Sequence, residues 1–413
     1  MASRADITRK YALAYARASK KDKGTLLDEV CAVTGWSRDN ARRRLAQARK
    51  PRSVGKSKRK PRSRKYSYDA VKVLQQVWAA TGGQCGKYLS ASMALQLDLL
   101  EAHGELVGGA GRYSAEVRAE LLDMSAATID RYLAPTRAKD PLRGISTTAP
   151  SPLLRTSIQV RQAGDEVEDT PGFFEGDTVA HCGPTLKGEF ARTINLTDML
   201  TGWVYTRSMR NNAHVHIRQA MDTALEQIPY EVTGADFDNG SEFINHDMIE
   251  WAACRDIYFT RSRPYKKNDQ ATIESKNNHL VRRYAYYWRY DTQRALSLLN
   301  ELWPLVNDRM NYLTPTRKPI EWATDAQGRR KRIYDDPATP FDRLLDSGIL
   351  TAEQTDELTA HRNSLNPAHL GREIDRIQQQ LTLLAKQKTL QLQATHTKPR
   401  PDTNRGVKLH DAS

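Results

Sequence analysis

Three acidic residues lie within or at the end of a predicted strand or helix. Asp177 lies within a predicted strand, Asp238 ends another strand before Asn-Gly, and Glu274 lies in the first turns of a predicted helix. Residues 239 to 273, 35 in all, separate the second acid from the third. Open α/β sheets place their sites at the carboxyl ends of strands, and oxygen ligands without Cys or His suit Mg²⁺ or Mn²⁺. The three carboxylates therefore predict a divalent metal site.

The third acid lies among cations and amides in the segment "NDQATIESKNNHLVRR", residues 268–283. A carboxylate within a cationic surface is repelled by the phosphates that the surface attracts, unless a divalent metal bridges it to them. The residues on this helix that are expected to hold a DNA backbone follow Glu274 in the sequence: Lys276, Asn277, Asn278 and Arg282. Each acid alone also has an ordinary interpretation, as a buried strand acid, a turn-forming Asp or a charge at a helix N-terminus.

The charge of the whole chain favours a polyanionic partner. Its 413 residues include 63 Lys and Arg against 49 Asp and Glu, a formal net charge of +14. Between residues 42 and 65 there are 13 cations and no acid, mixed with Ser, Pro and Gly rather than with large apolar residues. This pattern favours nucleic acid over a membrane surface, with a solvated linker or localisation tag as the alternative. Within residues 49–66 the predicted DNA contacts are Arg52, Lys56, Lys58, Arg59, Lys60 and Arg62.

The first 48 residues have the order of a helix-turn-helix module. An apolar run from Ile7 to Ala18 precedes "TLLDEVCAVT", a Gly35-Trp36 turn, and a basic helix that opens at Ser37. An ordinary three-helix bundle would give the same pattern. The positions expected to face a DNA groove are Arg38, Asn40, Arg43 and Arg44, with Ala41 and Leu45 packed inward.

A second helical module is expected after the basic linker. It begins at Tyr68 and ends with a helix through Leu122, a break at Met124-Ser125 and a last helix stopped by Pro135. In that last helix the exposed positions would be Thr128, Asp130 and Arg131, and the core positions Ile129 and Leu133. Two tandem modules of this kind would read a long, asymmetric DNA site.

The pattern changes after an extended connector at residues 136–170. Three predicted strands, "GFFEGDTVAHC", "ARTINLTDML" and "WVYTRSM", precede a helix, the strand "YEVTGADFD", a second helix, the strand "DIYFTRS" and a long helix from about Gln270. This order predicts a central α/β layer with a mixed five-stranded sheet.

Residues 172 to about 312 resemble the ribonuclease-H-like catalytic core of retroviral integrases and DDE transposases, especially those of bacterial insertion sequences. The segments "FFEGDTVAHCG", "DFDNGSEFIN" and "RSRPYKKNDQATIESKN" carry the resemblance. It implies that Asp177, Asp238 and Glu274 are catalytic and hold two Mg²⁺ ions, with Mn²⁺ as a substitute. Asp236 also precedes the turn, but the acid that adjoins Asn-Gly matches the family's ligand. The basic loop before the glutamate is expected to grip DNA through Arg263, Lys266 and Lys267.

The resemblance implies a DNA transposase that binds transposon ends, cleaves strands and joins the 3′-hydroxyl ends to target DNA. Its expected partners are double-stranded DNA, as terminal inverted repeats and target, and further copies of itself on that DNA. We expect neither a membrane nor a small-molecule substrate, and a location in the bacterial cytoplasm at the nucleoid. The alternatives are a catalytically inactive DNA-binding regulator and a metal-dependent nuclease without strand transfer.

The last third is expected to be mostly helical after a basic stretch from Arg317 to Arg332 that could form a small β element. Ile374, Ile377, Leu381 and Leu384 recur at helical spacing and favour packing against the protein's own core over a coiled coil. The four cysteines are too dispersed for a zinc site. The expected domains are 1–48 and 67–135 (helix-turn-helix modules), 49–66 (basic linker), 136–170 (connector), 171–312 (catalytic core), 313–395 (basic and helical region) and 396–413 (disordered tail).

Overall fold

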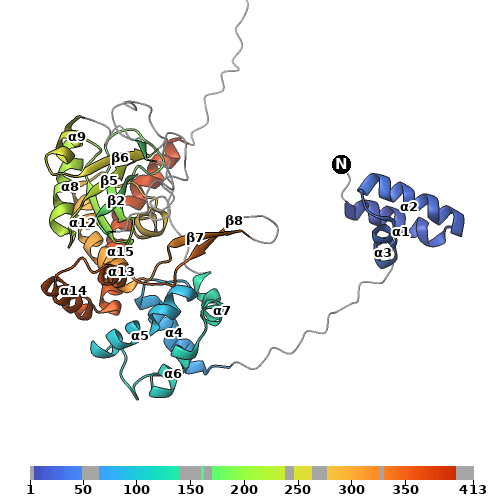
Figure 1. The fold of residues 1–413 in the computed structure, drawn as a ribbon, viewed down its shortest axis with the longest axis horizontal. Coiled ribbons are helices and arrows are strands. Elements are labelled where there is room, and N and C mark those ends of the chain that lie inside the picture. The colour runs from blue at the N-terminus through green and yellow to red at the C-terminus, as the bar shows by residue number, and fades with distance from the viewer. Residues whose placement is uncertain are drawn as a thin grey trace, which may run out of the picture. The chain divides into compact units, whose positions relative to one another are not determined.

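The computed structural model describes residues 4–48, 65–138, 160–161, 170–237, 246–262, 277–324 and 330–396. The chain forms two compact units, residues 1–65 and residues 66–413 (Figure 1). The first unit is purely helical where it is described, and the second contains the sheets. Each unit is described by itself below.

The first unit consists of three helices around a small apolar core. They are α1 (Arg4–Arg17), α2 (Lys20–Thr34) and α3 (Arg38–Ala48). Gly35 ends α2 with a φ of 71°, and its N–H donates to the carbonyl of Cys31 at 2.8 Å. A residue with a β-carbon would be strained in this left-handed conformation, so the glycine permits the short turn into α3. Ala41 and Leu45 of α3 are fully buried, as predicted.

The second unit begins with four helices that share one apolar core. They are α4 (Tyr68–Ala80), α5 (Gly86–Ala102), α6 (Ala115–Asp123) and α7 (Ala126–Arg137). Ile129 and Leu133 are fully buried in that core, as predicted. The prediction that Pro135 stops the last helix is wrong, because α7 continues to Arg137. A proline in the final turn removes only one intrahelical hydrogen bond, and the helix tolerates that loss.

Helices α4–α7 pack directly on the rest of the second unit. Gln84 and Gln96 each donate their side-chain amide to the carbonyl of Leu313, at 3.1 and 2.8 Å. Gln96 is fully buried, so its hydrogen bond lies inside the contact. In a further contact Arg372 forms an ion pair with Glu105 at 2.6 Å. Residues 66–137 therefore form a single compact unit with the sheet.

The central sheet has the strand order β1-β6-β5-β2-β3-β4. Its strands are β1 (Val160–Arg161), β2 (Phe173–Ala180), β3 (Arg192–Asp198), β4 (Val204–Met209), β5 (Gly234–Phe237) and β6 (Tyr258–Ser262). β2, β3 and β4 are antiparallel neighbours, whereas β5 and β6 run parallel to β2. The predicted mixed sheet of five strands is confirmed. The two-residue β1 adds a sixth strand, parallel to β6, from within the predicted connector.

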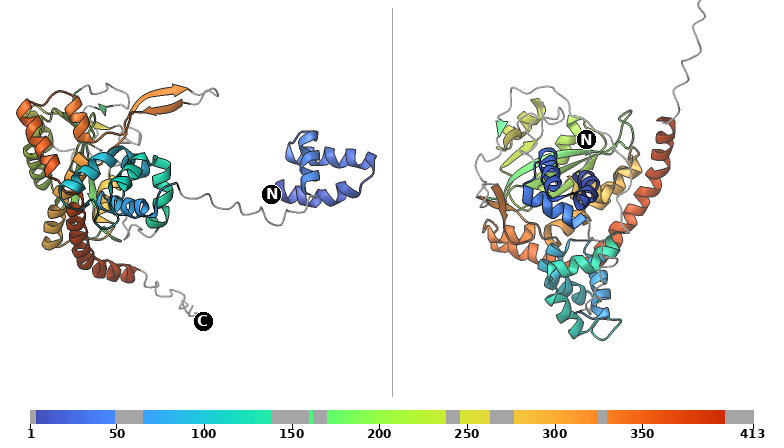
Figure 2. Two further views of the ribbon diagram at one scale, coloured as in Figure 1. Left: turned by 90° about the horizontal axis from the view of Figure 1, so that it is seen from below. Right: turned by 90° about the vertical axis from the view of Figure 1, so that its right-hand side faces the viewer.

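One face of the sheet is apolar and is covered by α8 (His214–Gln227) and α9 (His246–Ala253). Because strand side chains alternate between faces, Phe174, Leu196 and Phe237 point to this side and join one core with Met221 and Trp251 of the two helices. Figure 2 shows the second unit from two further directions.

The opposite face is covered by four helical segments and carries many polar side chains. The segments are η2 (Asn277–Arg282, a π-helical turn), α11 (Arg283–Ala285), α12 (Gln293–Asp308) and α15 (Pro367–His396). The described part of the predicted long helix runs from Asn277 to Ala285, and Tyr286 follows it with a φ of 57°. A buried hydrogen-bonded chain crosses this face: Trp303 donates to Ser208 at 2.7 Å, and Ser208 meets Thr193 at 2.7 Å.

Asparagines cover the exposed edge of the sheet at β4. Asn311, in the π-helical turn η3 (Arg309–Leu313), bonds both the N–H and the carbonyl of Val204, at 2.8 and 2.9 Å. Asn300 of α12 does the same for Ser208, at 2.9 and 3.0 Å. These backbone groups point away from β3 and would otherwise offer a template for another strand. The asparagines therefore close the sheet where a further strand would pair.

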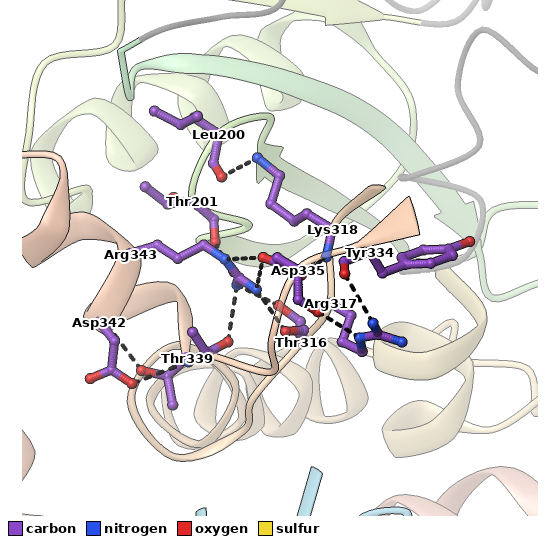
Figure 3. A network of polar contacts seen from close by, with 11 residues as sticks. Leu200, Thr201, Thr316, Arg317, Lys318, Tyr334, Asp335, Thr339, Asp342 and Arg343 are labelled. Carbon is purple, nitrogen blue, oxygen red and sulfur yellow. Dashed lines mark hydrogen bonds and ion pairs between the residues drawn. The ribbon is translucent and has the colours of Figure 1, made fainter. Parts of the chain in front are cut away.

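A two-stranded hairpin, β7 (Pro319–Thr324) and β8 (Arg330–Tyr334), projects from the sheet domain, so the predicted β element is present. A polar network fixes its base (Figure 3). Arg343 donates to the carbonyl of Thr316 at 2.6 Å and to Asp335 at 2.9 Å, while the Lys318 ammonium donates to the carbonyl of Leu200. Burial lowers the pKa of Lys318 to about 8.

The chain ends in α13 (Pro340–Asp346), α14 (Ala352–Ser364) and α15. Ile374, Ile377 and Leu381 of α15 are buried in the same core as Trp303 of α12. The prediction that this stripe packs against the protein's own core is confirmed for these three residues, whereas Leu384 is 47% exposed. Among the helices that the structure describes, none has the length and apolar character to cross a bilayer.

Candidate active site

Asp177 lies in β2 on the polar face of the sheet, half-buried and opposite Asn195 of β3. One carboxylate oxygen accepts the N–H of Thr178 at 2.6 Å, and the other accepts the side-chain amide of Asn277 at 2.5 Å. Asn277 in turn accepts the amide of Asn195 at 3.2 Å. The three side chains form a hydrogen-bonded chain that holds the carboxylate in one orientation.

Asp238 and Glu274 lie outside the described residues, but described neighbours of both acids lie beside Asp177. Phe237, which precedes Asp238 in the sequence, pairs across the sheet with Gly176, which precedes Asp177. Asn277 follows Glu274 by three positions in the sequence and bonds Asp177 directly. The described parts of three sequence segments that carry the acids therefore converge on one place.

Gly176 explains how β2 and β5 approach each other at this place. A β-carbon at Gly176 would lie 2.3 Å from the ring of Phe237 and 3.0 Å from Leu196. No real side chain makes such a contact, so only glycine lets the phenylalanine ring pack across β2. The ring lies on the apolar face, while the neighbouring Asp177 points to the polar one.

The helical segment that follows Glu274 is held tightly on the sheet. It begins as the π-helical turn η2, a rare conformation that is common at functional sites. Leu280 and Val281 of this turn are fully buried against Val179 of β2 and the residues of α12. The position of Asn277 beside Asp177 is therefore fixed by apolar packing one turn later.

Two further acids lie deeper on the same face, and the sequence interpretation did not single out the first of them. Glu175 and Asp236 pair across β2 and β5, and each is only 3% exposed. Asp236 accepts the hydroxyl of Thr260 at 2.8 Å. The signal for Glu175 was its spacing, because residues two apart in a strand share a face.

Arg282 and Asn277 differ from their predicted role as DNA-backbone contacts. Arg282 is 8% exposed and donates to the carbonyl of Ala180 at 3.0 Å, so its guanidinium lies within the protein. Asn277 uses both ends of its amide inside the site. Both residues lie in the π-helical turn η2, where ordinary α-helical spacing does not hold, and both side chains bond to β2.

Arg282 also acts on the neighbouring His181, which is fully buried and meets Thr193 at 2.7 Å. Burial, with a smaller contribution from the charge of Arg282, holds the pKa of His181 well below its usual value. The imidazole is therefore neutral at physiological pH and serves the packing of the polar face.

The donor set of Asp177 fits a hard divalent cation. It offers carboxylate oxygens, and the neighbouring Asn195 has a buried amide oxygen for which the described residues provide no hydrogen-bond partner. Oxygen donors of this kind suit Mg²⁺ and Mn²⁺ rather than zinc. Within the described ranges no three His, Cys, Asp or Glu side chains come together as a metal site, and two of the three predicted ligands lie outside those ranges.

The predicted groove-facing residues of the first unit differ in their exposure and in the contacts they make within the protein. Arg38 donates to the carbonyl of Gly24 at 3.2 Å and pairs with Asp28 at 3.1 Å. Arg43 and Arg44 are exposed, and Arg44 lies over the Trp36 ring at 5.6 Å. Asn40 accepts a 3.4 Å hydrogen bond from Arg43. Arg43 and Arg44 are thus the cations of α3 that remain most available to a ligand.

In α7, Arg131 is exposed, whereas Thr128 is half-buried and meets the hydroxyl of Ser125 at 3.1 Å. Asp130 was expected to be an exposed reading position, but its carboxylate accepts the N–H of Gly86 at 2.7 Å and pairs with Arg137 at 2.6 Å. It joins α7 to the start of α5 instead.

The other predicted contacts cannot be placed. The side chain of Asn278 lies outside the described part of the chain. The same holds for ten whole residues: Arg52, Lys56, Lys58, Arg59, Lys60, Arg62, Arg263, Lys266, Lys267 and Lys276.

Comparison with known proteins identifies this region. Residues 169–267 match the family model described as "Integrase core domain". The chain is 33% identical over 343 residues to the uncharacterized protein y4rM of Sinorhizobium fredii, an alignment that covers 83% of this chain and 95% of that protein. It is also similar to the crystal structure of the catalytic core domain of BIV integrase, with 16% identity, 43% of this chain and 95% of that chain covered, and a TM-score of 0.29.

The match supports an integrase- or transposase-like core at residues 169–267, as the sequence motifs predicted. The chain belongs to the same family as y4rM.

Proposed function

We propose that this protein is a DNA transposase that cleaves DNA strands and joins 3′-hydroxyl ends to target DNA. The observation that carries the proposal is the 2.5 Å hydrogen bond from Asn277 to Asp177, because it joins the strand that carries one acid to the segment that follows Glu274. The integrase core match at residues 169–267 supports the same chemistry.

In this proposal Asp177, Asp238 and Glu274 hold the divalent metal ions. Two Mg²⁺ ions, when bound, supply the positive charge that lowers the pKa of an attacking water or 3′-hydroxyl and stabilises the phosphorane-like transition state. Asn277 orients the Asp177 carboxylate, and Asn195 orients Asn277. Because no side chain must act as a nucleophile, the same site serves cleavage and joining.

DNA recognition is assigned to exposed cations outside the site. Arg43 and Arg44 of the first unit and Arg131 of α7 are exposed where they are described. The net charge of +14 and the basic run at residues 42–65 supply the phosphate attraction that such binding needs. We propose that the protein works as a homo-oligomer on DNA, since two transposon ends must be joined.

The test is a product assay with labelled DNA ends and a target plasmid. Asp177→Asn, Asp238→Asn and Glu274→Gln should each abolish cleavage and joining, while Asp346→Asn, an exposed acid of α13, should behave as wild type. Cleavage without joined products in the wild-type protein would favour a nuclease. DNA binding without either product would favour a regulator.

A further inference from the structure

A cavity of about 310 Å³ lies where four elements of the second unit meet. The turn between α4 and α5, the α11 segment, η3 and α15 each contribute to its lining. Asp177 is not among its lining residues, and of these the sequence interpretation singled out Ile374 alone, as a core residue. Its volume is at the lower end of the range of small-ligand sites, enough for a phosphate group with an attached sugar.

Two guanidinium groups line this cavity against a glycine pair. Arg309 and Arg283 approach Gly82 and Gly83, which have φ values of +78° and +76°. A β-carbon at Gly82 would lie 2.7 Å from an Arg309 nitrogen, and one at Gly83 would lie 2.6 Å from an Arg283 nitrogen. The glycines therefore serve two purposes: they permit the left-handed turn, and each leaves room for one of the two guanidinium groups.

The described hydrogen-bond partners of these two arginines are carbonyl oxygens. Arg283 donates to the carbonyl of Gly82 at 2.8 Å, and Arg309 donates to the carbonyl of Ala80 at 3.2 Å. Within the described residues neither arginine forms an ion pair with an acid. The lining contains one carboxylate, that of Asp375, which is exposed at the cavity rim.

Arg309 also has an unused donor. The residue is 3% exposed, and its Nε–H is buried without a hydrogen-bond partner among the described residues. A buried guanidinium without a counter-charge costs free energy, and native proteins usually complete such a group with an anion or an ion pair. The Tyr284 hydroxyl lies near the same spot, 3.1 Å from the position of a β-carbon on Gly82.

We infer that this cavity binds a phosphate group between Arg283 and Arg309. Paired guanidinium groups offer planar, charge-assisted hydrogen bonds to phosphate oxygens, and the ring of Trp78 beside them provides an apolar wall for a sugar or base. Arg283 lies nine residues after Glu274 in the sequence. A phosphate held here would therefore tie helices α4–α7 to the segment that leads from the candidate active site.

The phosphate can belong to a DNA backbone or to a free nucleotide. The first source deepens the proposed function and rests on it, whereas the second does not. Both share the same chemistry at the two arginines, so the experiment begins with inorganic phosphate and then separates the sources.

The first measurement is calorimetric titration of the full-length protein with inorganic phosphate, against chloride at matched ionic strength. Arg283→Gln keeps a donor for the Gly82 carbonyl but removes the charge, and should weaken phosphate binding about tenfold or more. Arg309→Lys keeps the charge but loses the planar donors and should weaken binding similarly. Arg294→Gln removes an exposed arginine of α12 and should bind phosphate as wild type does. The Tm of each variant without phosphate shows whether it is folded.

The second measurement repeats the titration with two other ligands, used separately: a DNA duplex and a nucleoside monophosphate. If the source is DNA, Arg283→Gln should weaken duplex binding. Asp177→Asn should bind the duplex as wild type does. If the source is a nucleotide, Arg283→Gln should weaken binding of the nucleoside monophosphate and leave duplex binding unchanged. Wild-type protein that binds phosphate no better than chloride, or folded Arg283→Gln and Arg309→Lys proteins that bind it as wild type does, would overturn the inference. Neither result depends on strand cleavage.

Discussion

The two faces of the central sheet differ in chemistry although they are built from the same strands. On the face covered by α8 and α9, Phe174, Leu196 and Phe237 form part of a continuous apolar core. On the opposite face the same strands present Asp177, Asn195 and other polar side chains, many of them fully buried. Apolar burial stabilises the fold, whereas burial of polar groups costs free energy unless they are bonded. The difference suggests that the first face maintains the sheet and the second is retained for function.

Phe174→Ala should give the largest loss of stability. The ring is 1% exposed and stacks on Tyr230 with centroids 6.1 Å apart. Its removal leaves a cavity in the apolar core and should lower the free energy of unfolding by about 3–5 kcal/mol. Urea denaturation followed by circular dichroism measures it. A loss below about 1 kcal/mol would mean that this face is not the main source of stability.

Asn277→Ala should affect activity more than stability. Asn277 orients the Asp177 carboxylate, and loss of such a supporting hydrogen bond typically weakens metal affinity or activity about 10–100-fold. The Mg²⁺ concentration for half-maximal cleavage should rise. Asn363→Ala, on the exposed side of α14, provides the matched control. An unchanged metal dependence in Asn277→Ala would remove this residue from the site.

His181 should make the polar face sensitive to acid. Its pKa is held well below the usual value in the folded protein, because it is buried and lies near Arg282. Below pH about 6.5 the unfolded chain binds a proton that the folded one does not, so stability falls as pH falls, by up to about 1.4 kcal/mol per pH unit. Unfolding at pH 7 and pH 5.5 measures this loss. His181→Gln should show a smaller difference between the two pH values, and an equal difference would assign the effect to other groups.

Thr197→Val should have the smallest effect and the opposite sign. The hydroxyl of Thr197 is buried on the polar face and has no hydrogen-bond partner in the described part of the protein. Replacing it with a methyl group of similar shape removes an unsatisfied polar group and should stabilise the fold by about 1 kcal/mol. A clear loss of stability in chemical denaturation would show that the hydroxyl has a partner.

The sequence predicted the strands of the sheet because their alternating patterns and turn residues are local signals. It also predicted the burial of Ala41 and Leu45, since both follow from helical spacing. Asp177 was found from its place in a predicted strand and from the motif that resembles the integrase core, and it lies on the polar face of the sheet.

Other features depend on contacts between distant segments and had no local signal. The asparagines that cover β4 lie about a hundred positions from the strand they bond. Arg282 is buried within a π-helical turn, which has no sequence signature. The use of Asp130 between α7 and α5 requires the helices to be placed first. From helical spacing alone, such residues are predicted to be exposed and able to bind a ligand.

The most direct test of the account measures two properties of the Asp177→Asn protein side by side. If the polar face exists for chemistry, this variant should lose strand cleavage and joining by at least about 10³-fold in Mg²⁺. Its free energy of unfolding should stay within about 1 kcal/mol of wild type, because the amide keeps the shape of the carboxylate. Asp346→Asn should change neither property. Cleavage at the wild-type rate by folded Asp177→Asn protein would contradict the account.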